Sequence, residues 1–353
     1  MKRIITRADF VNRQYSFKKS TLIIFCILLS LTAVPAQDEV SADEKLKSYL
    51  HRDFFKLNIL MQSGARFSFR DDNFQGGRTF ELANARISLR GGLNKGFFYR
   101  ININAVSDPV LLDAFVGYRL NKYVSVAAGA MKPTQTLDYM PEPGSTDFID
   151  RTKMTGLLVS SREIGVSASG DIGDFYYYAG IFNGTRLQRN NNNKMYGIGR
   201  LQYTIRDLIP ASMQLGLSAS HGNSPGVRSG SSGPFLEGTR TIWGADLRVE
   251  SGKMILASEY LAGHLQVVGM AGEKELISGY YFTYGYVVSE SLMVLGRWQT
   301  WSYREADTRE SQLTLGTNIT VTELVSFRFN IDAYIPANAG NSYGASAVFQ
   351  VQF

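Results

Sequence analysis

The chain has 353 residues, with 37 Lys and Arg, 31 Asp and Glu, three His and a single Cys. A mean hydropathy of −0.12 excludes a protein built of many membrane-spanning helices, because such a chain needs repeated long apolar runs. An apolar fraction of 44% excludes a mostly disordered chain. Three histidines argue against a histidine-rich metal site, and we expect no cofactor.

The first 36 residues predict a secretory signal peptide. Lys18 and Lys19 precede an apolar run from Thr21 to Val34, and Val34 and Ala36 supply the small residues needed for cleavage after Ala36. This run is too short to span a bilayer as a helix, so a retained membrane anchor is the weaker alternative.

Removal of this leader changes the charge and the cysteine content. The leader carries a net charge of +5, so the formal +6 of the whole chain falls to +1 in the mature chain. We therefore expect no binding to nucleic acid from overall charge. The only cysteine, Cys26, is lost as well, so the mature chain has no disulfide.

From residue 54 onward, apolar and polar residues alternate with period two, which is typical of β-strands with one apolar and one polar face. The polar residues before this point, 37–53, are interpreted as a short periplasmic N-terminal segment. The alternation predicts 16 strands, an even number as in bacterial single-chain barrels. The predicted strands are 55–69, 79–91, 96–106, 109–120, 123–131, 161–170, 174–183, 195–205, 211–220, 240–250, 253–262, 275–288, 291–303, 309–320, 324–335 and 342–353.

The connections between these strands alternate in length. Every second one is short, whereas the others include the long segments 70–78, 132–160, 184–194, 221–239 and 263–274. A membrane barrel with both termini in the periplasm has short turns on that side and long loops outside, and a soluble sandwich has no reason for such sorting. Three of the expected long connections, 107–108, 304–308 and 336–341, are short, so the sorting is a tendency.

These patterns predict an all-β fold, a transmembrane antiparallel up-and-down β-barrel of about 16 strands over residues 54–353. In the bilayer core no water can pair a free backbone N–H or C=O, so only helices or closed barrels cross it. The last predicted strand alternates fully and ends in Phe353, similar to the C-terminal strand signal of bacterial outer-membrane barrels. Aromatic residues at strand ends fit the girdles at the membrane interfaces, with a core position as the alternative for each: Tyr118, Tyr123, Phe175, Trp298 and Trp301.

The polar face of the predicted strands lines a lumen in this fold and carries more bases than acids. The bases are Lys56, Arg66, Arg70, Arg86, Arg90, Arg100, Arg119, Arg200, Arg248, Arg297 and Arg328, and the acids are Asp113, Glu163, Asp246, Glu250, Glu259 and Asp332. Arginine presents a planar fork of donors that suits carboxylate and phosphate. Arg86 and Arg100 lie about halfway along neighbouring strands and could form a mid-barrel cluster with Arg200 and Arg297. The alternative is that these arginines pair with the acids and only keep the wall wet.

The connection 132–160 is the longest and has no evident strand, so we expect it to fold inward and form the constriction. Its apolar residues Leu137, Tyr139, Phe148 and Ile149 indicate packing against the inner wall. An external loop in contact with solvent or a neighbouring subunit is the alternative. The candidates for an anion pathway are Arg86, Arg100, Lys132, Arg151, Lys153, Arg162, Arg200 and Arg297.

Four segments in a fixed order resemble the phosphate-selective porin O/P family: AAGAMKP (127–133), DFIDR (147–151), SREIGVSASG (161–170) and YYAGIFNGT (177–185). The resemblance implies a 16-stranded, trimeric outer-membrane channel for anions whose third loop folds inward. The phosphate-selective members carry a denser run of bases in that loop. Here four acids stand beside three bases, namely Asp138, Glu142, Asp147 and Asp150 beside Lys132, Arg151 and Lys153.

We therefore expect a porin in the outer membrane of a Gram-negative-type bacterium, a homotrimer that lets small hydrophilic solutes diffuse, with a leaning to anions such as phosphate. The alternative is a structural barrel that serves secretion or adhesion without permeation. An enzyme is not expected, because a hydrolase needs an activated nucleophile or an acid–base pair. His51, His221 and His264 are the only histidines, and no Gly-x-Ser-x-Gly motif occurs.

Overall fold

The structure is a computed structural model that describes residues 50–52, 54–69, 74–159, 162–189, 192–209, 211–269 and 274–353. The predicted signal peptide, residues 1–36, lies outside these ranges. So do Arg70 and all but residues 50–52 of the predicted N-terminal segment.

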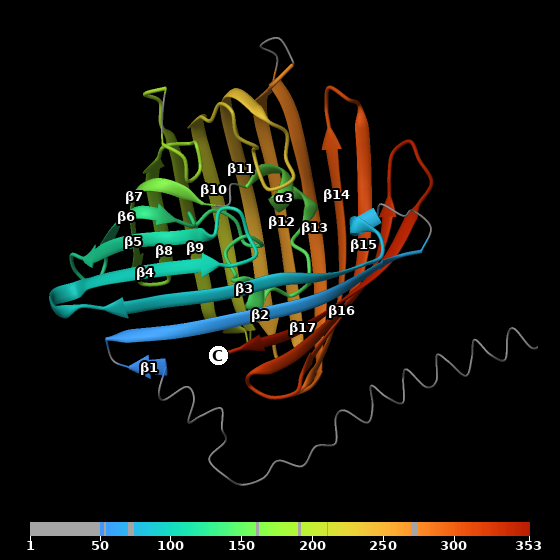
Figure 1. Ribbon diagram of the computed structural model, residues 1–353, viewed down its shortest axis with the longest axis horizontal. Coiled ribbons are helices and arrows are strands. Elements are labelled where there is room, and N and C mark those ends of the chain that lie inside the picture. Colours follow the sequence, from blue (N-terminus) through green and yellow to red (C-terminus); the bar gives the residue numbers. More distant parts are fainter. Residues whose placement is uncertain are drawn as a thin grey trace, which may run out of the picture. The chain divides into compact units, whose positions relative to one another are not determined.

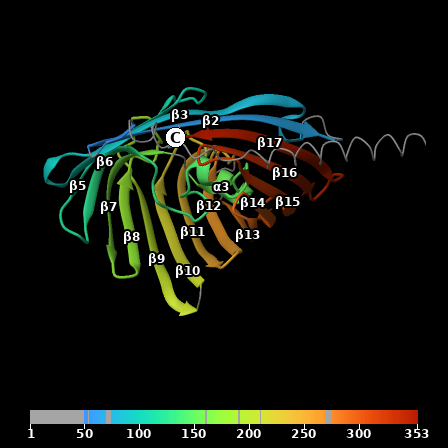
Figure 2. The same ribbon diagram turned by 90° about the horizontal axis from the view of Figure 1, so that it is seen from below.

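Sixteen antiparallel strands form a closed barrel in which each strand pairs with its neighbours in the chain (Figures 1 and 2). The ring closes where the last strand pairs with the first, from Gly344 opposite Ser68 to Gln352 opposite Leu60. The strands are β2 Phe55–Ser68, β3 Thr79–Gly92, β4 Phe97–Asn104, β5 Leu111–Arg119, β6 Ser125–Met131, β7 Glu163–Ile172, β8 Phe175–Phe182, β9 Tyr196–Ile209, β10 Ala211–Asn223, β11 Leu236–Ser251, β12 Met254–Val267, β13 Lys274–Ser289, β14 Leu292–Tyr303, β15 Thr308–Thr320, β16 Val325–Ile335 and β17 Ser342–Gln352.

A two-residue strand, β1 (His51–Arg52), also pairs with the start of β2. We call the end of the barrel that carries the connections 224–235 and 304–307 the long-loop end. The end with the tight turns after β11 and β13 is the short-turn end. Figure 1 shows the loop 224–235 at the top and these two turns at the bottom.

All sixteen predicted strands are confirmed, most with boundaries within two or three residues. The largest differences are at the end of β9, which is Ile209 rather than 205, and at the long-loop ends of β11 and β12, which begin at Leu236 and end at Val267 rather than at the predicted 240 and 262. Leu236 pairs with Val267 there, and both contact a buried apolar cluster inside the barrel. Apolar burial therefore extends pairing into segments that look like loop in the sequence.

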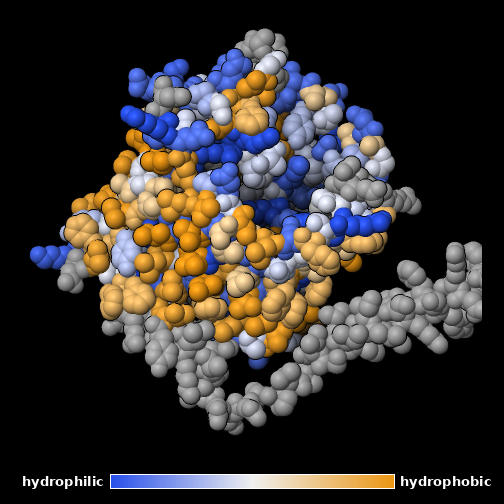
Figure 3. Space-filling view, viewed as in Figure 1, coloured by the Kyte–Doolittle hydropathy of each residue, from blue (hydrophilic) through white to orange (hydrophobic). Residues whose placement is uncertain are grey.

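The barrel is apolar outside and polar inside, the reverse of a water-soluble fold. Phe80 is 91% exposed and Val116 63%, whereas Asn102, Asp246 and Asp332 are buried on the inner face. Figure 3 shows hydrophobic residues gathered over the front wall of β2 to β5, beside a hollow lined by hydrophilic residues. An outward face of this kind is stable against acyl chains and would be unfavourable in water.

Short helices interrupt the connections. They are the 3-10 turns η1 (Phe74–Gly76), η2 (Asn94–Gly96) and η3 (Pro143–Ser145) and the α-helix α3 (Lys153–Leu158). Thr152 caps α3, because its side chain accepts the N–H of Thr155. Within the described ranges, no helix is long and apolar enough to cross a membrane.

The structure decides between the two alternatives, membrane girdle or core, for the two tryptophans of β14. Trp298 is 39% exposed on the outer face, as expected, but Trp301 is only 2% exposed and faces the interior. Three residues of separation in a strand place two side chains on opposite faces, so both tryptophans cannot meet lipid. Trp301 takes the alternative reading, a core aromatic.

Candidate functional site: a loop across the lumen and its cationic cluster

The connection between β6 and β7, residues 132–159, lies inside the ring of strands, where Figures 1 and 2 show α3. Its first part is fastened to β9, β10 and β12. Arg200 donates to the backbone oxygen of Gln135 at 3.1 Å, and the Gln135 side chain donates to Ser220. The buried carboxylate of Glu259 accepts the backbone N–H of Leu137 at 2.9 Å. The backbone N–H of Asp138 donates to the same carboxylate. Glu259 therefore accepts hydrogen bonds from two loop amides that water would otherwise bind, and this makes the attachment specific.

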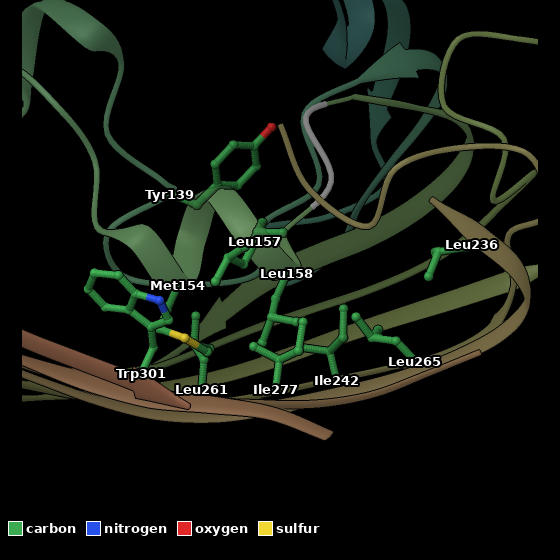
Figure 4. Close-up of a cluster of buried hydrophobic side chains, with 11 residues drawn as sticks. Tyr139, Met154, Leu157, Leu158, Leu236, Ile242, Leu261, Leu265, Ile277 and Trp301 are labelled. Carbon is green, nitrogen blue, oxygen red and sulfur yellow. The ribbon is translucent and has the colours of Figure 1, made fainter. Parts of the chain in front are cut away.

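The helical part of the loop packs against the wall mainly through apolar side chains, and the backbone N–H of Lys153 donates to Gln299 of β14 at 2.7 Å. Met154, Leu157 and Leu158 of α3, with Tyr139 and Val159, face Leu236, Ile242, Leu261, Leu265, Ile277 and Trp301 of β11 to β14 (Figure 4). Leu158 is fully buried. A side chain on Gly263 would meet Leu158 at 2.8 Å, and one on Gly279 would meet the sulfur of Met154 at 2.8 Å. Two wall glycines therefore let the helix approach closely.

Between these attachments, acids and carbonyl groups of the loop bind arginines of β2, β11 and β16. Asp150 forms a bidentate pair with Arg66 of β2, with distances of 2.7 and 2.9 Å. Asp147 binds Arg248 of β11 at 2.9 Å. Arg328 of β16 donates to the backbone oxygen of Pro143 at 3.0 Å. The loop thus contacts wall strands on every side of the lumen.

Glu142 is the centre of a group of positive side chains that we call the cationic cluster: Arg86, Arg100, Lys132, Arg151 and Arg162, with the carboxylates Glu142 and Asp113. Arg100 donates to Glu142 at 2.8 Å and Arg86 at 3.4 Å. Asp113 accepts a hydrogen bond from Arg162 at 3.1 Å and lies 3.6 Å from Arg100. Five cations against two carboxylates leave the cluster with excess positive charge.

Lys132 and Arg151 are held by backbone oxygen atoms of the loop rather than by acids. The ammonium of Lys132 donates to Met140 and Pro141 at 3.0 Å each and lies 4.6 Å from the centre of the Tyr139 ring. Arg151 donates to the carbonyls of Asp138 and Pro141. Carbonyl oxygens carry only partial charge, so the hydrogen bonds of these two side chains do not neutralise them as a carboxylate would.

Burial and the surrounding charges shift two pKa values in the loop. Burial, assisted by the charges of Arg151, Arg162 and Arg86, lowers the pKa of Lys132 to about 7. Burial alone would raise the pKa of Glu142, but the charges of Lys132 and Arg100 outweigh it and lower that pKa to about 2. Glu142 is therefore ionised at any physiological pH, whereas Lys132 titrates near neutrality.

The cluster has donors that no protein group uses. The Nη2 of Arg162 and the Nε of Arg100 are buried and make no hydrogen bond. A cavity of about 490 Å³, on the side of the loop that faces the β7–β8 turn, is lined by the bases Arg100, Lys132 and Arg206 and by the acids Glu142, Asp171 and Asp174. A solute in that cavity therefore meets charged groups of the cluster together with the two aspartates of the β7–β8 turn.

The other predicted site residues lie elsewhere. Arg200 has no exposed side-chain surface and forms a bidentate pair with Asp246 at 2.6 and 2.8 Å. Arg297 donates to the backbone oxygen of Asp150 and lies over the ring of Phe148. Lys153 begins α3 and has its ammonium 5.9 Å from the Trp301 ring. Arg86 and Arg100 thus meet at Glu142, without contacts to Arg200 or Arg297. Several other arginines pair with acids of the lumen, as expected in the alternative in which the arginines only keep the wall wet.

Sequence reasoning missed a second anchor of the loop. Arg240 of β11 is fully buried, binds Glu163 of β7 at 3.1 Å and donates to the backbone oxygen of Ser229. The Gly/Ser-rich segment 224–235 turns inward there, and Ser232 donates to the backbone oxygen of Gly156 at 2.8 Å. The glycines of this segment permit such close contact, and they are the feature of the sequence that could have indicated it.

The two histidines whose side chains are described do not face the lumen. His221 and His264 both stand opposite Thr241, on the outward face that also carries the exposed Trp243. Among the described residues, no group of three or more His, Cys, Asp or Glu side chains could hold a metal ion.

Comparisons with known proteins agree with this architecture. The profile of a family described as "Phosphate-selective porin O and P" matches residues 55–308. OmpT of Vibrio cholerae superimposes with a TM-score of 0.61 at 9% identity, covering 85% of this chain and 97% of that one. An anion-selective porin from Comamonas acidovorans gives 0.61 at 15% identity, with coverages of 85% and 99%.

The outer-membrane channel DcaP of Acinetobacter baumannii gives a TM-score of 0.58 at 10% identity, covering 85% of this chain and 97% of that one. Comparison with curated proteins found no match. At these identities the solved structures show the shared fold, whereas the profile covers well over half of the sequence. The chain belongs to the phosphate-selective porin O and P family and is a channel of the Gram-negative outer membrane.

Proposed function

We propose that the channel prefers small anions such as phosphate and that the cationic cluster produces this preference. The observation that carries the proposal is the excess of five positive side chains over two carboxylates around Glu142, with buried arginine donors that no protein group occupies. Rings of charged side chains set ion selectivity in pores, and arginine presents donors that match phosphate oxygens.

The remaining loop contacts do not provide a comparable excess. Arg66 faces both Glu81 and Asp150, and Arg248 faces both Asp147 and Glu250. These arginines are neutralised where they lie, so they hold the loop and contribute little field. One protein of similar fold also supports a preference for anions, since the Comamonas acidovorans porin is described as anion-selective.

The test is the reversal potential of single channels in planar bilayers, first under a KCl gradient and then under a potassium phosphate gradient. We expect a potential displaced toward the anion equilibrium. Arg100→Gln should lower the anion-to-cation permeability ratio about threefold, the effect of one unit charge about 6 Å away in water-like dielectric.

Arg248→Gln is the matched control, because the side chain of Arg248 is 25% exposed and that of Arg100 is 26% exposed. The control removes an equal charge and the same chemical group from a neutralised site. Cation preference of the wild type, or equal effects of the two variants, would contradict the proposal.

A second candidate, a structural barrel without permeation, is favoured by the number of wall strands that the loop contacts. The loop binds Arg66, Arg248, Glu259 and Arg328 on different sides of the lumen, so it divides the interior into separate spaces. One of these spaces, lined by Leu137, Asp147, Phe148 and Arg297, measures only about 280 Å³. Absence of any unitary conductance for the refolded protein would select this candidate.

We also propose that the protein assembles as a homotrimer. The outward face of β5 to β10 bears a concave apolar groove of about 940 Å³, where Val116, Val166 and Ile181 surround small residues such as Gly180 and Gly199. A second copy could fill it closely, and the Vibrio cholerae protein has a structure described as a trimer form. Light scattering in detergent tests this: Ile181→Arg should give monomers, whereas Ile331→Arg, on an exposed face remote from the groove, should not.

Finally, we propose that residues 1–36 direct export and are removed. The mass of the protein purified from outer membranes should correspond to a chain that begins at Gln37.

A further inference from the structure

Three aromatic rings lie in a row on the inner face of the barrel, and we call them the aromatic ladder: Phe74, Tyr334 and Trp301. The ring centres of Phe74 and Tyr334 are 6.0 Å apart at an interplanar angle of 10°. Those of Tyr334 and Trp301 are 6.0 Å apart at 8°. The three planes are nearly parallel although the residues come from η1, β16 and β14.

Residues of the barrel wall hold these rings so that they point toward the lumen. Tyr334 shares a face with Arg328, whose side chain binds the loop inside the barrel. A side chain on Gly344 would meet the Phe74 ring at 3.0 Å, so a glycine lets Phe74 lie flat on β17. Figure 4 shows Trp301 next to Met154 of α3, so its far side is covered while Phe74 and Tyr334 remain half-buried.

Hydrogen-bonding side chains surround the ladder on the same inner face. Glu310 stands directly opposite Trp301, and Gln312 stands opposite Tyr334. Gln312 donates to Asp332 at 2.7 Å, and the second oxygen of Asp332 is buried without a hydrogen bond. The Oγ of Ser346 is also buried and unbonded. Glu310 and Gln312 are only partly buried, so they can exchange hydrogen bonds with hydroxyls.

The charge of this wall differs from that of the cationic cluster. Glu310 and Asp332 are acidic, and the ammonium of Lys153 lies over the Trp301 ring. A wall with two carboxylates beside one ammonium does not favour an anion, and the aromatic faces need no charge on their partner. The chemistry suits a neutral solute that offers an apolar face and a rim of hydroxyls.

We propose that the aromatic ladder is a binding track for a linear oligosaccharide at the long-loop end of the channel. A pyranose presents axial C–H groups on one face, which stack on aromatic rings, and hydroxyls at its edge, which pair with amides and carboxylates. Trp301 is only 2% exposed and supports the ladder from behind, so sugar units would meet the exposed surfaces of Phe74 and Tyr334. Trp301 and Tyr334 lie near the ends of β14 and β16, so the track begins at the mouth of the barrel. It concerns a second solute class and a different wall from the anion preference.

The test uses the full-length protein in detergent and in planar bilayers, with maltohexaose as the probe. Calorimetry should show saturable binding, and the sugar should interrupt the ionic current in a concentration-dependent manner. Tyr334→Ala and Phe74→Ala should each weaken binding about tenfold, the size of one good aromatic contact. Tyr334→Phe keeps the ring and should stay within about threefold of the wild type.

Tyr284→Ala is the matched control, because Tyr284 is a strand tyrosine on the outer face, 43% exposed. It should leave binding unchanged, and all variants should keep the reversal potential in KCl, which reports the cationic cluster. Wild-type protein that shows no heat of binding with maltohexaose, or an unchanged affinity in Tyr334→Ala and Phe74→Ala, would overturn the proposal. Calorimetry does not depend on conductance or anion preference, so this failure and failure of the proposed function can be told apart.

Discussion

The two halves of the inward loop are attached to the barrel in different ways. Residues 132–142 are held by hydrogen bonds and ion pairs, and Glu142, the acid at their end, has a side chain that is 36% exposed. The helix α3 is held by apolar packing in which Leu158 has no exposed surface. Dry packing fixes the position of the loop, and this allows the charged half to remain in contact with water.

The comparison also separates two kinds of arginine. Arg200 is buried with Asp246 and works as a structural fastening, whereas Arg100 borders a cavity and faces two acids shared with other cations. Charge excess, not arginine number, therefore distinguishes a wall that can attract an anion from a wall that is only held together.

The largest expected effect comes from breaking the buried fastening. Arg200→Ala leaves Asp246 buried without its partner, which typically costs about 3–5 kcal/mol of stability. We expect a lower urea midpoint for unfolding in detergent, followed by tryptophan fluorescence. A variant that replaces both Arg200 and Asp246 by alanine should be less destabilised than Arg200→Ala, and equal losses would contradict this account.

Shortening the helix contact should have a comparable or slightly smaller effect. Leu158→Ala creates a cavity between α3 and β12, with a typical cost of about 2–5 kcal/mol. Because this contact fixes the loop, single-channel recordings should also become noisier or larger in conductance. Leu217→Ala, on the exposed outer face, is the control. If the noise and the conductance of single channels are unchanged in Leu158→Ala, other contacts fix the loop.

Changing the acid of the charged half should alter selectivity more than stability. Glu142→Gln removes the negative charge at the centre of the cationic cluster, and the anion-to-cation permeability ratio should rise by up to about threefold, less the charge that Lys132 loses when Glu142 no longer raises its pKa. Its ion pairs are partly exposed and contribute at most about 1 kcal/mol. Reversal potentials before and after the change measure the effect, and a fall in the ratio would refute the assignment.

The smallest effect is a dependence on pH. The pKa of Lys132 is lowered to about 7, so the cluster loses one positive charge as the pH rises from 6 to 8. Anion preference should therefore decline over this interval, by about threefold or less. The pKa of Glu142, about 2, lies too low to contribute. Lys132→Arg stays charged and should remove the dependence, so a persistent slope in that variant would point to another group.

The strands were predictable because their signal is local: each alternates with period two, and both faces can be read in the sequence. For Trp301 the sequence leaves a girdle and a core position open, because its place at a strand end favours the girdle whereas parity with Trp298 favours the core. The longer ends of β11 and β12 could not be foreseen, since they depend on packing against α3, more than 70 residues earlier in the chain.

For the site, residue types were easier to predict than partners. Arg86 and Arg100 were expected to lie together, and the sequence placed Glu142 in the long loop. It could not show that Glu142 would lie between them, because that depends on how the loop crosses the lumen. The alignment of Phe74, Tyr334 and Trp301 was equally hidden, since no spacing within one strand connects three separate elements.

The seam between β2 and β17 has a consequence for biosynthesis. Ile59 and Phe353 exchange backbone hydrogen bonds of 2.7 and 3.0 Å, and Gln62 binds Gln350 across a sequence separation of 288 residues. Until these partners meet, β2 exposes an unsatisfied edge that could pair with another chain. A growing polypeptide cannot satisfy that edge while it emerges from the ribosome, so export machinery and chaperones must keep the early strands apart until translation has finished.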